Sequence, residues 1–471
     1  MRFAGYWLAA GCVLALVAPG VARADVIGDW NGIAQTETLL LRPTAHGQAR
    51  GIAMVEGAVY DAVNALDATG VRYQPYLLDL DQLHAQPFGS QDAAAATAAY
   101  QVLLAITPDT RHDGLTTAYN ATLQGIPDGA SEDEGIRVGA AAADAMLDFR
   151  QNDGFLAPFT FDIGLDPGDW RPIGFSVDPP APGVRDPDAW VGNMKPFLIE
   201  SPSQFRAEGP DSLTSGSYTK DFNEVKEVGA LNSTTRTADQ TAAAVFWQYA
   251  PIRFWNVLGL SLADRYDLDT ADQARLYAMI NLAAADGAIA CWNEKFYWNF
   301  WRPIAAIREA DTDGNPATIA DPTWEPLFSP ATPTAPPLGT PPFPDYPSGH
   351  GCLTGAVMST MADFFGTNKV EVTVVSGRSL NGVPIPARHF DRFSDVAKEV
   401  IDARVWGGIH FRTADVHGTV IGKKVAHWLH KHYFQPVGKH KLREALEQGF
   451  LVGRELAEEL LANILHRLRP R

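Results

Sequence analysis

A loop-to-helix junction constrains this chain more than any other stretch: residues 343–350, with the sequence FPDYPSGH. It ends a proline-rich loop and is followed by an apolar run, residues 352–365, that is typical of a buried helix. Ser348 stands at the position of a helix N-cap. The free N–H groups and the dipole of such a helix N-terminus favour a bound anion. His350 follows in the same turn, where it could act on that anion as a general acid or base.

Two further segments contribute cations. In residues 292–303, Lys295 and Arg302 lie seven positions apart, which predicts that both occupy one face of a single aromatic-rich helix. In residues 403–415, an arginine precedes a histidine by six positions. Cations in aromatic surroundings are costly to bury without an anionic partner. The three segments therefore predict a site for a phosphate-like oxyanion, built from Lys295, Arg302, Ser348, the N–H of Gly349, His350, Arg404 and His410.

This ordered set resembles the signature shared by the vanadium-dependent haloperoxidases and the type 2 phosphatidic-acid-phosphatase superfamily. That signature reads Lys-x6-Arg-Pro, then Pro-Ser-Gly-His, then Ser-Arg-x5-His-x3-Asp, and the likeness covers the stretch 290–420. The sequence departs from it twice. Ala403 stands where the signature has serine, and Asp415 lies five rather than four positions after His410. The role of Asp415 therefore stays open.

The resemblance implies paired four-helix bundles with the site in the second bundle. It also implies an orthovanadate cofactor whose vanadium is bonded by His410 and whose oxygens are held by Lys295, Arg302, Ser348, the N–H of Gly349 and Arg404. Lys295 would polarise hydrogen peroxide and His350 would transfer the proton. Phe343 and Trp292 match aromatic positions beside the halide site of fungal chloroperoxidase-type members. The expected reaction oxidises halide to hypohalous acid, which then reacts with a small organic acceptor.

The same residues suit two other functions. In an acid phosphatase, phosphate could occupy the vanadate site, His410 would attack phosphorus, and His350 would protonate the leaving alkoxide. A non-catalytic protein that only binds an oxyanion is the remaining alternative. The aromatic pair Phe343 and Trp292, and the large N-terminal half of the chain, favour the haloperoxidase.

Helical periodicity extends over most of the chain and predicts a mainly α fold of helical bundles. We expect a signal peptide (1–24), an N-terminal helical half (25–235), a catalytic helical region (236–436) and a C-terminal amphipathic helix (437–471). Stretches rich in proline, glycine and aromatic residues predict long ordered loops at 152–232 and 311–346, and a brief isolated strand is expected at 370–375. The expected helices are 50–66, 91–106, 112–123, 132–150, 238–266, 271–310, 353–365 and 394–434, the last with candidate breaks at Gly407 and Gly408.

The N-terminal segment predicts export to the periplasm or the medium. Arg2, an apolar stretch and Ala22-Arg23-Ala24 together read as a secretory signal with a cleavage site, and a lipoprotein signal ending at Cys12 is the alternative. No later stretch reaches the roughly 20 apolar residues that a membrane-spanning helix needs, so no stable membrane insertion is expected. The formal net charge of −17 argues against nucleic acid or anionic membranes as partners.

Four smaller features are ambiguous. Cys291 and Cys352 could form a bridge or remain buried thiols. Residues 311–315 begin like a calcium loop, but no glutamate follows at the twelfth position, so a polar turn is favoured. His427, His430 and His432 stand near a helix C-terminus and are interpreted as dipole-complementing side chains rather than metal ligands. Asp61 lies within an apolar helix, where a buried arginine could pair with it.

Overall fold

The computed structural model describes residues 25–68, 70–161, 163–177, 180–248, 251–329 and 339–437. The predicted signal peptide and all but the first residue of the predicted C-terminal helix lie outside this part of the chain. Within it the fold is mainly α, as predicted. The helices are α1 (Val26–Leu41), α2 (Ala45–Ala65), α3 (Leu80–Leu83), α4 (Gln91–Ile106), α5 (His112–Gln124), α6 (Ala130–Phe149), α7 (Gly216–Val228), α8 (Ala238–Phe246), α9 (Pro251–Arg265), α10 (Thr270–Trp298), α11 (Pro303–Arg308), α12 (Gly349–Phe364), α13 (Phe393–Trp406) and α14 (Arg412–His432).

The N-terminal helices pack around α2, which is buried along almost its whole length. Helices α1, α4 and α6 cover it, and α5 packs against α4. Close packing is possible because alanine dominates the shared faces, as in the buried run Ala93–Ala96 of α4. Thr44 caps the N-terminus of α2, and this end of the helix points toward the other half of the molecule, where the functional site lies.

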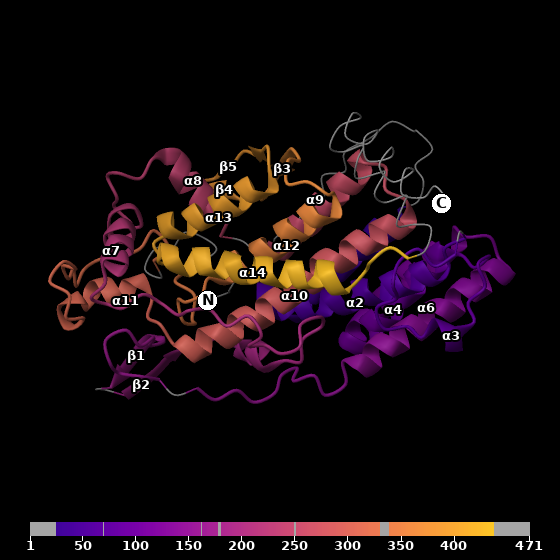
Figure 1. Cartoon of the computed structure of the whole chain (residues 1–471), viewed down its shortest axis with the longest axis horizontal. Coiled ribbons are helices and arrows are strands. Elements are labelled where there is room, and N and C mark those ends of the chain that lie inside the picture. The colour runs from indigo at the N-terminus through magenta and orange to yellow at the C-terminus, as the bar shows by residue number, and fades with distance from the viewer. Residues whose placement is uncertain are drawn as a thin grey trace, which may run out of the picture.

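Helix α10 joins the two halves (Figure 1). It packs against α2 on one side and against α12 and α14 on the other. Alanine, glycine and other small residues fill its middle turns, so neighbours can approach from every side and nearly all of the helix is buried. Its C-terminal turns carry Trp292 and Lys295 into the layer formed by α12 and α14.

Helices α12 and α14 cross at unusually close range because glycines line the contact. A Cβ atom added to Gly418 of α14 would lie 2.5 Å from the carbonyl oxygen of Ser348, and one added to Gly355 of α12 would lie 2.5 Å from that of Thr419. Gly422 meets the backbone of α12 even more closely. This crossing fixes the start of α12, with Ser348 and His350, beside the start of α14, which follows His410.

Two helix predictions need correction and a third is confirmed. Helix α10 ends at Trp298, because Asn299 adopts a left-handed conformation with φ 48° and Pro303 begins the separate helix α11. Lys295 and Arg302 therefore do not share a helix face. The expected helix 238–266 is two helices, α8 and α9. The break within 394–434 occurs where it was predicted, with Gly408 at φ 74°.

The expected loops contain some regular structure. Residues 152–232 include the antiparallel hairpin of β1 (Ile173–Val177) and β2 (Pro180–Val184), and also α7. The expected strand at 370–375 is β3 (Val372–Val374), which is not isolated because it pairs with β6 (Arg388–Phe390). A further short pair joins β4 (Ser379–Leu380) to β5 (Val383–Pro384). Among the described helices, none combines the length and apolar character needed to cross a membrane.

Candidate active site

The proline-rich loop before α12 and the loop that carries His410 meet the end of α10 near Lys295. Its ammonium group is fully buried and donates to the carbonyl oxygens of Pro344 at 2.8 Å, Asp345 at 3.0 Å and Pro347 at 2.5 Å. These three bonds hold the proline-rich loop in place around the end of α10. Burial lowers the pKa of Lys295 to about 8. All three N–H groups point at this loop, so the predicted role of Lys295 in holding an oxyanion requires it to release at least one carbonyl.

Arg302 connects this loop to the loop that carries His410. Its Nε donates to the carbonyl oxygen of Phe343 at 2.9 Å, and its Nη1 donates to that of Ile409 at 2.8 Å. The same Nη1 lies 3.1 Å from Nε2 of His410. Nη2 is buried and has no hydrogen-bond partner among the described residues. Burial lowers the pKa of Arg302 to about 10, so it remains cationic at neutral pH.

Arg404 reaches the same region from the end of α13. Its Nη1 donates to Oε1 of Gln248 at 2.8 Å, while its Nε is buried without a hydrogen-bond partner in the described part of the chain. Burial lowers its pKa to about 9, and the carboxylate of Asp415 opposes this shift. The two arginines thus each have one buried donor group without a hydrogen-bond partner among the described residues.

His410 is neutral and held between a cation and a carboxyl group. Burial, followed by the charges of Arg302 and Lys295, keeps its pKa well below the usual value. Its Nδ1 lies 2.8 Å from Oδ1 of Asp345, close but not aligned as in a linear hydrogen bond. These neighbours assign the proton to Nδ1, which leaves the lone pair of Nε2 for Arg302 or for a ligand.

Asp345 is a site residue that the sequence analysis passed over. Its side chain is fully buried, and burial raises its pKa to about 7 against the opposing charges of Arg302 and Lys295. An aspartate within an otherwise apolar proline-rich loop was a signal that a cation or imidazole must lie nearby. Asp415 does not contact His410. It lies beside the hydroxyl of Ser348 and near Arg404, and burial raises its pKa.

A cavity of about 210 Å³ opens onto these groups. Two helix N-termini line it, that of α2 with Thr44 and His46 and that of α12 with Gly349 and His350. Arg404 and His410 reach it as well, and the other lining residues include Gln248, Leu353, Trp292 and Phe343. The structure therefore brings the predicted histidines and aromatic residues to one cavity. Lys295, Arg302 and Ser348 lie behind its wall.

The aromatic wall has a third member, His46, which the sequence analysis also missed. Its ring stacks on Trp292 with centroids 3.8 Å apart, and Phe343 packs against both rings. The carboxylate of Asp186 accepts a hydrogen bond from Nε1 of Trp292 at 2.8 Å and lies 3.1 Å from Nε2 of His46. No short motif in the sequence connects these residues, since they come from α2, from the segment after β2 and from α10.

The donors of this site fit a tetrahedral oxyanion. Nη2 of Arg302 and Nε of Arg404 are buried donors without a hydrogen-bond partner among the described residues, and an oxyanion would satisfy both. A Cβ atom on residue 349 would lie 2.8 Å from the Trp292 ring, so glycine lets the first turn of α12 pack directly against this ring. A neutral imidazole with a lone pair on Nε2, which here faces Nη1 of Arg302, is also the form that binds a metal or attacks phosphorus.

The described residues show how the four ambiguous sequence features are arranged. Cys291 and Cys352 are buried free thiols. Asp313 accepts from the backbone of Asn315 and from the Thr318 hydroxyl, which makes 311–315 a polar turn. Among the described residues, no cluster of acidic, histidine and cysteine side chains could hold a metal, including the histidines of α14. Asp61 forms no ion pair with an arginine of the described ranges; it accepts three backbone N–H groups, from Tyr76, Leu77 and Leu78.

Comparisons with known proteins agree with this geometry. Residues 275–439 match the family of the VCPO second helical-bundle domain. A vanadium chloroperoxidase of Curvularia inaequalis is 30% identical over 273 residues, a match that covers 46% of this chain and 44% of that protein, so it spans less than half of the relative's length. Solved structures share the fold more widely. A bacterial vanadium-dependent iodoperoxidase is similar with a TM-score of 0.69 and 21% identity, over 89% of this chain and 98% of the other.

The holo form of a bacterial vanadium-dependent chloroperoxidase gives a TM-score of 0.61 at 17% identity, over 87% of this chain and 93% of the other. At these identities the solved structures establish the fold, while the family match covers the α10–α14 region that carries all three motifs. Residues 275–439 thus match the VCPO second helical-bundle domain, and the chain shares the fold of the bacterial vanadium-dependent iodoperoxidase and chloroperoxidase.

Proposed function

We propose that this protein is a vanadate-dependent haloperoxidase, which converts hydrogen peroxide, halide and a proton into hypohalous acid and water. The proposal rests on two buried donor groups, one on Arg302 and one on Arg404, that have no hydrogen-bond partner among the described residues. They flank a neutral His410 at the end of a cavity with an aromatic wall. Buried cations of this kind require an anion to bind. An aromatic wall favours a polarisable halide over the polar alcohol that a phosphatase must accommodate or release.

In this proposal the site residues have separate roles. Arg302, Arg404, the Ser348 hydroxyl and the N–H of Gly349 would hold the vanadate oxygens, and Nε2 of His410 would bind the metal. When bound, vanadate supplies a Lewis-acid centre that activates peroxide without a change of its own oxidation state. His350, in the first turn of α12, lines the cavity and is positioned to move a proton. Trp292, Phe343 and His46 exclude water from the halide.

Lys295 has a supporting role in this geometry. It carries a positive charge close to the oxyanion site, but its three donors bind the loop that precedes Ser348. It therefore sets the position of the α12 N-terminus, and through it the Gly349 N–H and His350. A direct contact with vanadate or peroxide would need a rearrangement of the 344–347 loop.

The test uses the purified chain, stripped of bound anions and divided in two. One portion receives orthovanadate, hydrogen peroxide and bromide and is assayed for bromination of monochlorodimedone; the other receives p-nitrophenyl phosphate without vanadate. We expect vanadate-dependent bromination that His410→Ala abolishes, while His432→Ala, on the exposed end of the same helix α14, leaves it unchanged. Rapid phosphate release that vanadate inhibits, with no halogenation, would instead establish the acid phosphatase. Anion binding without either turnover would leave the non-catalytic alternative.

A further inference from the structure

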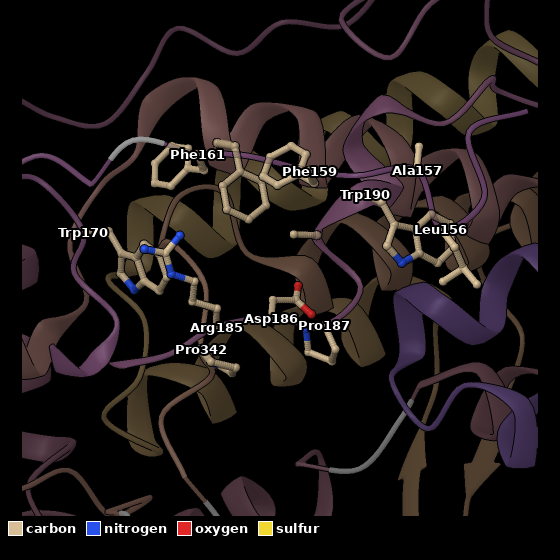
Figure 2. A pocket seen from close by; sticks show the side chains of 12 residues that line it. Leu156, Ala157, Phe159, Phe161, Trp170, Arg185, Asp186, Pro187, Trp190 and Pro342 are labelled. Atoms are coloured by element: carbon tan, nitrogen blue, oxygen red, sulfur yellow. The ribbon is translucent and has the colours of Figure 1, made fainter. Parts of the chain in front are cut away.

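A second cavity, of about 230 Å³, lies beside the catalytic one and is walled by aromatic rings (Figure 2). Phe159 and Phe161 pack against Phe296 with ring centroids 4.7 and 5.0 Å apart, and Phe161 lies 6.3 Å from Trp170. Trp190 closes the opposite end of the cavity. An apolar cavity of about 150 Å³ is enough to accept benzene, so this one has room for a single substituted aromatic ring.

The two cavities are separated by one layer of side chains. Phe296 follows Lys295 on α10, and Pro342, which lines the second cavity, precedes Phe343, which lines the first. Asp186 lines the second cavity, and its carboxylate contacts the Trp292 and His46 rings that line the first. A molecule in the second cavity would therefore lie directly behind the wall at which hypohalous acid is expected to form.

A cation lies at one end of the second cavity. Arg185 is exposed and forms no hydrogen bond or ion pair with another described residue. Its side chain points toward the Trp170 end of the cavity, whereas Asp186, the next residue, lies apart from it near Pro187 (Figure 2). The carboxylate of Asp186 is already bound by Trp292, His46 and the N–H of Asp188, so it does not compete for the guanidinium. Arg185 is thus available to an acidic ligand in a chain whose net charge is −17.

We propose that this second cavity binds the organic acceptor of halogenation, an electron-rich aromatic acid such as a hydroxyaryl carboxylate. The ring packs against Phe159, Phe161 and Phe296, and its carboxylate pairs with Arg185. The proposal rests on the proposed haloperoxidase function for its reagent. Hypohalous acid crosses the side-chain layer, a ring carbon exchanges its hydrogen for the halogen, and the displaced hydrogen leaves with the hydroxyl as water. An electron-rich ring is required because the halogen reacts as an electrophile.

Binding is measured first, without vanadate or peroxide, by calorimetry on the full chain with 4-hydroxybenzoate and its neutral analogue 4-hydroxybenzamide. We expect one site for 4-hydroxybenzoate, weakened at least tenfold by Arg185→Gln, and an amide affinity that this substitution does not change. Ala157→Trp, at an exposed lining position, should block both ligands. Arg137→Gln, at an exposed arginine of α6, is the matched control. Equal binding of 4-hydroxybenzoate to wild type and Arg185→Gln, or undiminished binding to Ala157→Trp, overturns the proposal.

Turnover then tests the role of the cavity in the reaction. With vanadate, peroxide and bromide, bromination of 4-hydroxybenzoate should saturate, and Arg185→Gln should raise its KM at least tenfold while kcat stays the same. Oxidation of iodide to triiodide, which needs no organic acceptor, should be equal in the two proteins. An unchanged KM for 4-hydroxybenzoate contradicts an acceptor site. Absence of halide oxidation in the wild type contradicts the haloperoxidase instead, and the binding result still decides whether the cavity takes aromatic acids.

Discussion

Oδ1 of Asp345 lies 2.8 Å from Nδ1 of His410, and both side chains are buried. The two residues come from different loops, one before α12 and the other between α13 and α14. The family signature has an aspartate four residues after this histidine. Here Asp415 is displaced by one position and lies instead beside Ser348 and Arg404. A carboxyl group that orients a metal-binding histidine keeps the other ring nitrogen free of a proton.

Asp345→Asn should therefore weaken vanadate binding by about 10- to 100-fold, the usual effect of losing a carboxylate behind a metal-binding histidine. The overall fold should persist, because asparagine has nearly the same volume. Vanadate affinity is measured by titrating the anion-free protein and following recovered halide oxidation. Asp311→Asn, at an exposed position, is the control. If the dissociation constant of Asp345→Asn for vanadate lies within twofold of the wild-type value, Asp345 does not position His410.

The same substitution should change how stability depends on pH. Burial raises the pKa of Asp345 from 3.8 to about 7, so between these values the folded protein holds a proton that the unfolded chain has lost. The free energy of unfolding contributed by Asp345 therefore falls as pH rises through this window, by up to about 4 kcal/mol. The asparagine side chain of the variant does not titrate. Urea unfolding measures this effect: from pH 5 to pH 8, the free energy of unfolding of the wild type should fall relative to that of Asp345→Asn. A difference between the two proteins that stays constant, or that changes in favour of the wild type, contradicts the raised pKa.

Much of the site could be predicted because its residues lie in three short motifs. Those motifs identified His350, Arg404 and His410 as neighbours, and the family resemblance implied that Trp292 and Phe343 belong to the same site. All five residues line the cavity. These motifs are informative because each is a local structure, a helix N-terminus or a loop beside one, whose geometry follows from a few consecutive residues.

The rest depends on contacts that no local pattern contains. Asp186 binds His46 and Trp292, and the three residues come from α2, from the segment after β2 and from α10. Helical periodicity also placed Lys295 and Arg302 on one face, and that was wrong. Asn299 can adopt the left-handed conformation that ends α10, and nothing in the apolar pattern reveals that it does so. The direction of the three Lys295 donors likewise depends on the tertiary path of the 344–347 loop.

The close crossing of α12 and α14 gives a prediction about stability and site assembly together. In Gly418→Ala the new methyl group would lie 2.5 Å from the carbonyl oxygen of Ser348, so the helices must separate. We expect a loss of about 1–3 kcal/mol in the free energy of unfolding, the usual cost of overpacking, and weaker vanadate binding because Ser348 moves away from His410.

Gly114→Ala is the matched control, since nothing lies within 4 Å of a Cβ atom at this exposed position in α5. It should stabilise the protein by about 0.5–1 kcal/mol, because alanine loses less conformational freedom than glycine in a helix. Urea unfolding measures both variants. Equal effects of the two substitutions would show that the α12–α14 contact tolerates a methyl group and does not position the site.

His46 should determine how well the site binds halide. Its ring forms part of the cavity wall next to the aromatic pair Trp292 and Phe343, and its Nε2 lies 3.1 Å from the carboxylate of Asp186. His46→Phe keeps an aromatic ring against Trp292 and removes the ring nitrogens, which are the polar atoms that this ring can offer to a bromide ion. The KM for bromide should then rise about tenfold, equivalent to about 1.4 kcal/mol, while the KM for hydrogen peroxide changes less than twofold.

His432→Phe provides a control of the same chemistry, because His432 packs against Trp428 with ring centroids 3.9 Å apart, on the exposed end of α14, and does not line the cavity. Steady-state kinetics with bromide and peroxide varied separately distinguish the two roles that His46 can have. A rise in both KM values together with lower thermal stability would mean that His46 only supports the packing of Trp292. A rise in the bromide KM alone, with unchanged stability, assigns His46 to the halide, because the loss of the ring nitrogens then affects the anion and not neutral peroxide.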